Sequence, residues 1–81
     1  MNVRVQFYAQ LRDIAGSSES TIEVPDSGTV RELMDEIYRE NPSLRPLDKT
    51  ILVGAGVEFV DRNYRIKPGE TISIMPPVQG G

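Results

Sequence analysis

Hydrophobic and polar residues alternate at the start of the chain, where Val3, Val5 and Phe7 fall on one side and Arg4 and Gln6 on the other. This period of two, carried by β-branched and aromatic residues, predicts a half-buried strand. Similar patterns farther along predict strands over residues 20–25, over residues 51–60 with a glycine-rich turn inside, and over residues 71–75.

The clearest element that the sequence predicts is a helix between residues 29 and 41. Thr29 and Glu32 have the spacing of a capping box, in which each side chain accepts a hydrogen bond from the other residue's backbone amide. The helix should end at Asn41, because Pro42 disfavours a helical conformation in the residue before it. A continuous apolar stripe predicts the buried face of the helix: Val30, Leu33, Met34, Ile37 and Tyr38.

Shorter segments connect these elements. Residues 9–16 predict a short helical turn with Leu11 and Ile14 on the same side. Residues 42–50 contain two prolines and predict irregular structure. Residues 67–70 place proline and glycine at the positions that a type II turn requires.

This order of elements predicts an α+β fold of two layers, because one amphipathic helix can cover only one face of a sheet. We expect a mixed sheet of four to five strands packed on one main helix. If the first and last strands lie side by side and parallel at the centre, the fold is a β-grasp (ubiquitin-like) fold. The 81 residues fit one domain, which we place at residues 1–75, followed by a flexible functional tail at residues 76–81.

The composition narrows the chemistry that is open to the chain. It contains neither cysteine nor histidine, which removes thiolate nucleophiles and the commonest general base and metal ligand. The formal net charge is -3, and the nine basic residues are scattered rather than gathered on the basic face that nucleic-acid binding needs. No apolar run reaches membrane-spanning length. We therefore expect a cytoplasmic protein with no bound cofactor or metal, no nucleic-acid partner and no membrane association.

An exposed apolar patch is predicted on the sheet face that the helix leaves uncovered. If the inward residues of the first and last strands pack under the helix, Tyr8 and Met75 emerge on the opposite face. Phe59 is expected to join them, because it alternates with Glu58 and Val60 along its strand. We interpret this patch as a partner-binding surface beside the tail, with edge packing as the alternative. Gly54 and Gly56 form a G-x-G without a following helix, which indicates a turn or bulge rather than a dinucleotide site.

The sequence closes with the segment MPPVQGG, which has a specific chemical logic. A terminal carboxylate has a pKa of about 3.3–3.7, so it is ionised in the cell and is a poor electrophile. Another enzyme must therefore activate it with ATP as an acyl-adenylate. Gly80 and Gly81 lack Cβ atoms and let the backbone pass through a narrow site, while Pro76 and Pro77 hold the tip away from the domain. The alternative is a frayed terminus.

The stretches VRVQFYAQLRDIAG, TVRELMDEI and MPPVQGG together resemble the ubiquitin-like sulfur-carrier family, and within it the small subunits of molybdopterin synthase. The resemblance spans essentially the whole chain, and the terminal motif is its most specific part. It implies a β-grasp fold and a role in sulfur transfer. One departure is Gly54-Ala55-Gly56, where the family usually carries a small residue, an apolar residue and asparagine.

The resemblance implies that an adenylating enzyme of the ubiquitin-activating type consumes ATP and loads AMP onto Gly81. Sulfur from a persulfide donor then displaces AMP and leaves a thiocarboxylate, which enters the large synthase subunit and supplies sulfur for molybdenum or tungsten cofactor. A chain without cysteine could carry covalent sulfur only at this carboxyl terminus. On the family's pattern the reactive and threading residues are Gly80 and Gly81, the channel residues Pro76, Pro77 and Val78, and the docking residues Tyr8, Phe59 and Met75.

Other functions are compatible with the same fold and tail. The chain could be a ubiquitin-like protein modifier that is conjugated through Gly81 to substrate lysines. It could be a sulfur carrier for another pathway, such as thiazole or cysteine synthesis. It could also be an interaction module whose terminal glycines have no chemical role.

Overall fold

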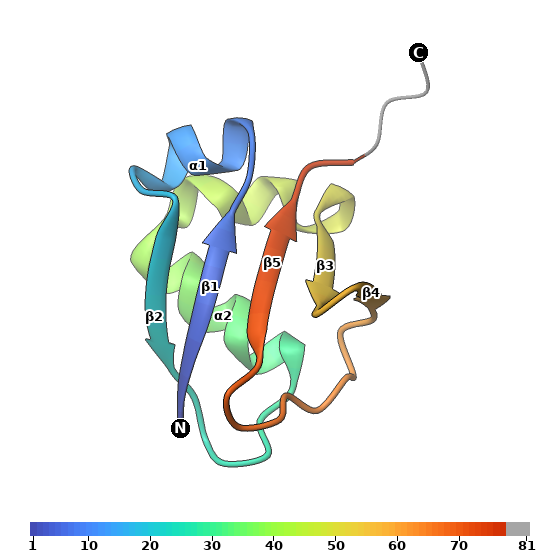
Figure 1. Ribbon diagram of the computed structural model, residues 1–81. Helices are drawn as coiled ribbons and strands as arrows, with labels where there is room; N and C mark the ends of the chain where they lie inside the picture. Colours follow the sequence, from blue (N-terminus) through green and yellow to red (C-terminus); the bar gives the residue numbers. More distant parts are fainter. Residues whose placement is uncertain (78–81) are drawn as a thin grey trace.

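The computed structural model describes residues 1–77, and these form a five-stranded sheet with helices on one of its faces (Figure 1). The elements in chain order are β1 (Asn2–Phe7), α1 (Gln10–Ala15), β2 (Glu19–Glu23), α2 (Val30–Glu40), η1 (Pro42–Thr50), β3 (Leu52–Ala55), β4 (Glu58–Val60) and β5 (Thr71–Met75).

The strand order in the sheet is β2-β1-β5-β3-β4. The first and last strands, β1 and β5, are parallel neighbours, with Val5 opposite Ile72 and Phe7 opposite Ile74. All other neighbouring strands are antiparallel. The prediction of a two-layer α+β fold with parallel first and last strands at the centre is therefore confirmed.

Helix α2 covers one face of the sheet and forms the core with it. Its capping box is present, because Thr29 and Glu32 exchange hydrogen bonds between side chain and backbone as predicted. The whole predicted stripe of α2 is buried, from Val30 to Tyr38. These side chains pack against the inward residues of the strands, chiefly Val3, Val5, Phe7, Ile22, Val53, Ile72 and Ile74.

The structure corrects two details of the sequence prediction, the conformation of residues 42–50 and the end of the second strand. Residues Pro42–Thr50 form a 3-10 helix rather than irregular structure, with Pro42 at its start, where a missing amide is harmless. The predicted short helix is present as α1, with Leu11 buried and Ile14 41% exposed. The second strand, β2, ends at Glu23, two residues earlier than predicted. The type II turn prediction fits the structure, since Gly69 has a φ of +86° and the Glu70 amide bonds the Lys67 carbonyl.

A polar cluster fastens the 3-10 helix and the connection after β4 to α2. The carboxylate of Asp48 accepts a hydrogen bond from the Tyr38 hydroxyl and pairs with Arg31 and Arg62. Arg62 also donates to the backbone carbonyls of Asp48 and Ile51, at 2.7 and 3.1 Å. Burial alone would raise the pKa of Asp48, but the hydrogen bonds from Tyr38 and Arg31 outweigh it and hold the pKa below its usual value.

Replacing Asp48 by asparagine should lower the free energy of unfolding by about 1–3 kcal/mol at pH 7, because the ionised acceptor of three side chains is lost. The pKa of Asp48 is lower in the folded protein than in the unfolded chain, where it is about 3.9. The stabilisation by ionised Asp48 is therefore fully present above about pH 3.9 and is lost as the pH falls through the pKa of the folded protein. Urea unfolding of both proteins at several pH values should therefore show a difference that shrinks below about pH 4.

The exposed Asp35 on α2 offers a matched control, since Asp35→Asn removes the same charge outside the cluster. Its effect should stay within about 0.5 kcal/mol. Equal destabilisation by both substitutions at pH 7 would contradict a structural role for the cluster.

Candidate functional site

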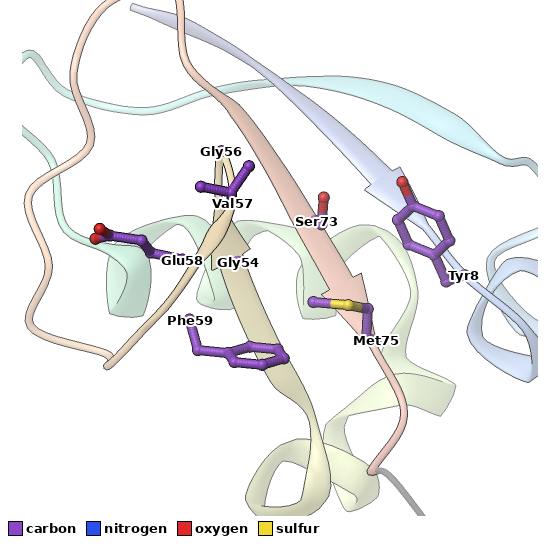
Figure 2. A pocket seen from close by; sticks show the side chains of 8 residues that line it. All are labelled: Tyr8, Gly54, Gly56, Val57, Glu58, Phe59, Ser73 and Met75. Atoms are coloured by element: carbon purple, nitrogen blue, oxygen red, sulfur yellow. The ribbon is translucent and has the colours of Figure 1, made fainter.

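The sheet face opposite α2 is uncovered and carries an apolar cavity with a volume of about 260 Å³. We call this face the open face, and its hollow the open-face cavity. Side chains from β3, β4, β5 and the end of β1 surround the hollow (Figure 2). The residues that line it are Tyr8, Gly54, Gly56, Val57, Glu58, Phe59, Ser73 and Met75.

Strand register brings these residues together. Gly54 in β3 lies opposite Phe59 in β4 and opposite Ser73 in β5, so the three form one row across the sheet. Met75 lies two residues beyond Ser73 and opposite Leu52. Because side chains alternate between faces along a strand, Phe59, Ser73 and Met75 project away from the core.

The sequence predicted that Tyr8, Phe59 and Met75 would emerge together on the uncovered face, and their placement there is confirmed (Figure 2). Phe59 is 68% exposed and Tyr8 is 44% exposed. Large apolar side chains that gather in one exposed patch are characteristic of interaction surfaces. The role of these three residues in docking a partner stays a prediction.

Backbone contacts hold Tyr8 at the edge of the cavity. Its amide donates to the Ile74 carbonyl at 3.1 Å, which extends the pairing of β1 with β5, and its hydroxyl donates to the Gln6 side chain at 2.9 Å. The next residue, Ala9, turns the chain into α1 with a φ of +52°. A non-glycine residue in this conformation costs about 1–3 kcal/mol and persists only where surrounding structure imposes it. The backbone position of Tyr8 is therefore set by the fold.

Five cavity residues were not singled out as site residues from the sequence: Gly54, Gly56, Val57, Glu58 and Ser73. Gly54 was interpreted only as part of a turn or bulge, but it lies within β3, whereas Gly56 does form the turn, with a φ of +63°. Val57 at the same turn is fully exposed. Ser73 carries no sequence signal beyond its outward position in the alternation of β5.

The tail begins at the edge of this cavity. Met75 is the last residue of β5, and Pro76 and Pro77 follow it, the first half-buried and the second exposed. Val78, Gly80 and Gly81 lie outside the described residues, so their predicted roles are not tested by the structure.

The open-face cavity is small. Ligand pockets for small molecules occupy about 300–1,000 Å³, and the open-face cavity is smaller. Within residues 1–77, no group of three or more acidic, histidine or cysteine side chains could hold a metal ion. No helix in the same part of the chain is long and apolar enough to span a membrane.

Comparisons with known proteins agree with this description. A molybdopterin synthase sulfur carrier subunit of Chlamydomonas reinhardtii is 30% identical, and the match covers 100% of both chains. A solved structure of molybdopterin converting factor subunit 1 from Pyrococcus furiosus superimposes with a TM-score of 0.87 at 26% identity, over 96% of this chain and 99% of the other.

Two further solved structures show how widely the fold is used. One is a complex of subunits 1 and 2 of the molybdopterin-converting factor from Helicobacter pylori. The matched chain of that complex is 26% identical to this chain and superimposes with a TM-score of 0.71, and the match covers 100% of both chains. The other is small archaeal modifier protein 1 of Haloferax volcanii, with a TM-score of 0.83 at 21% identity, over 95% of this chain and 98% of the other. At that identity the likeness shows the fold alone.

The model of the ThiS family matches residues 5–81, which is nearly the whole chain. The fold is accordingly the ubiquitin-like β-grasp that the sequence predicted. By this match, and by its full-length relation to molybdopterin synthase sulfur carrier subunits, the chain belongs to the ThiS family.

Proposed function

We propose that this chain is the sulfur carrier subunit of a molybdopterin synthase and that it acts in the cytoplasm. The observation that carries the proposal is the match to the Chlamydomonas reinhardtii sulfur carrier subunit, which covers both chains completely. The open face and the absence of cysteine and histidine support a carrier whose reactions are catalysed by other proteins.

The chemistry of the proposed carrier takes place at the carboxylate of Gly81. An adenylating enzyme joins this carboxylate to AMP and releases pyrophosphate from ATP. A persulfide sulfur then attacks the activated carbonyl carbon, AMP leaves, and a thiol cleaves the resulting acyl disulfide to give the thiocarboxylate and a new disulfide. Gly80 and Gly81 suit this role because a backbone without Cβ atoms fits a narrow channel. In this proposal ATP is consumed by the partner, and the carrier binds no cofactor.

The large synthase subunit is the proposed recipient of the sulfur. The name of the Helicobacter pylori structure describes subunits 1 and 2 of a molybdopterin-converting factor in one complex, which supports an equivalent pairing here. In that pairing Tyr8, Phe59 and Met75 contact the large subunit, while Pro76, Pro77 and Val78 lie along the entrance to its active site. The adenylating enzyme and the sulfur donor are the other two partners that the proposal requires.

Sulfur loading can be followed by the mass of the intact protein. With its adenylating enzyme, ATP and a persulfide donor, the protein should gain the mass of one oxygen-to-sulfur exchange, because one oxygen of the Gly81 carboxylate is replaced and the chain has no cysteine that could hold sulfur instead. Deleting Gly81 should abolish the exchange and leave the melting temperature unchanged, since a terminal residue contributes little to the core.

Isopeptide-linked adducts without any sulfur exchange would instead show a protein modifier. A marked fall in melting temperature on deletion of Gly81 would mean that the tail is part of the packed domain. Wild-type protein that remains unmodified by an enzyme shown to be active would contradict the proposed function.

Docking through the open face can be tested by Phe59→Ala. Phe59 is 68% exposed, so its removal should change the free energy of unfolding by less than about 0.5 kcal/mol. An aromatic anchor in an interface contributes about 2 kcal/mol or more, so affinity for the large subunit should fall by about thirtyfold or more in calorimetric titrations.

The matched control for this experiment is Ile14→Ala. Ile14 is also exposed, at 41%, but it belongs to α1 and does not line the open-face cavity. Its truncation should leave the affinity close to that of the wild type. An equal loss of affinity in both variants would contradict docking centred on Phe59.

A further inference from the structure

We infer that Gly54 is a recognition element for the large subunit, because a residue without a side chain leaves room on the floor of the open-face cavity for one apolar side chain of that subunit. The inference rests on the proposed function and names a recognition element that the function itself does not specify. It concerns the open-face cavity, where Gly54 lies between Phe59 and Ser73 (Figure 2).

The fold itself does not require glycine at residue 54. The glycines with positive φ are Gly16, Gly56 and Gly69, and Gly54 is not among them. Any residue can therefore adopt its extended backbone conformation. Glycine within a strand weakens the strand, and it often marks a place where another molecule or backbone approaches closely.

The space above Gly54 belongs to the cavity. A Cβ atom at this position would lie 3.2 Å from the Met75 Cε atom, 3.6 Å from the Glu58 carbonyl oxygen and 3.8 Å from the Ser73 Cβ atom. The closest of these is the end of a flexible side chain, which can move by a few tenths of an ångström. A Cβ atom at residue 54 would thus be accommodated once the Met75 methyl group shifts, and a side chain there would occupy the floor of the cavity.

The size and lining of the cavity indicate what it accepts. Its volume of about 260 Å³ lies below the usual range for small-molecule sites, about 300–1,000 Å³, but suits a side chain inserted from a partner. Figure 2 shows the Met75 side chain extending from β5 toward β3, and the Phe59 ring below Gly54. No lysine or arginine of the described chain lines the cavity, and the Glu58 carboxylate points away from its centre. An uncharged apolar side chain is therefore the occupant that fits.

The length of the tail points to the large subunit as the source of that side chain. Residues 76–81 span no more than about 20 Å even when fully extended. The active site that receives Gly81 must therefore lie within about 20 Å of Met75, and Met75 itself lines the cavity. Buried anchors near the centre of an interface contribute most of its binding energy, and the open-face cavity is placed to receive one.

The inference can be tested with Gly54→Val. Valine favours strands, and replacing glycine restricts the unfolded chain, so the melting temperature should stay the same or rise. Affinity for the large subunit, measured by calorimetry, should fall at least tenfold because the floor of the cavity is filled. Gly54→Ala should give a smaller loss in the same direction, and it also provides a test if the valine variant fails to fold.

Thr71→Val is the matched control, because Thr71 faces outward on β5 but does not line the cavity. It should bind the large subunit with wild-type affinity. Folded Gly54 variants that bind as tightly as the wild type would overturn the inference, and so would a loss that Thr71→Val shares. If the Gly54 variants lost affinity only for the adenylating enzyme, the inference would also be overturned, because the cavity would then receive a side chain of that enzyme rather than of the large subunit.

Failure of this inference can be distinguished from failure of the proposed function. Sulfur loading of the wild-type protein is measured separately, by intact mass. If loading succeeds and Gly54→Val binds the large subunit normally, only the role of Gly54 is wrong. If the wild-type protein is never loaded by an active enzyme, the carrier function fails, and the inference fails with it.

Discussion

The parallel pairing of β1 with β5 at the centre of the sheet decides where the tail leaves the domain. The last strand of the chain is bonded on one side to β1 and on the other to β3, so the tail is attached to the most firmly held part of the sheet (Figure 1). Parallel pairing also places the end of β5 beside the end of β1, where Tyr8 bonds to Ile74. The base of the tail and the apolar residues of the open face therefore lie together.

The two faces of the sheet serve different purposes. On one face, the inward residues of the strands pack against the apolar stripe of α2 and form the core. The Asp48 cluster joins the 3-10 helix and the connection after β4 to α2 on the same side. With stability supplied from that side, the open face can carry residues that contribute little to folding. Gly54 and the exposed Phe59 are examples. In the proposed function, this surface lies beside the tail on which the partner proteins act.

Local patterns in the sequence predicted much of this structure, because alternation and helical periodicity report directly on burial. Alternation placed Phe59 and Met75 on the uncovered face, and the capping box marked the start of α2. The position of Gly54 between Phe59 and Ser73 could not be predicted in this way, since it depends on the register of β3 with both neighbouring strands.

The Asp48 cluster was missed for a related reason. It joins Tyr38, Asp48 and Arg62, which are distant in sequence and meet only after the chain has folded. The 3-10 helix was missed because its two prolines indicate a break in regular structure, although Pro42 at the start of the helix loses no hydrogen bond. Interactions set by tertiary contacts leave no short-range signal.

The central claim, that the open face is the surface presented to the large subunit, can be tested most directly by nuclear magnetic resonance. Amide signals of the isotopically labelled protein would be followed during titration with the unlabelled large subunit. We predict that the largest shifts occur at Gly54, Phe59, Ser73 and Met75, while Asp35 on α2 is unaffected. Shifts confined to the exposed side of α2, with the open face unchanged, would contradict the claim.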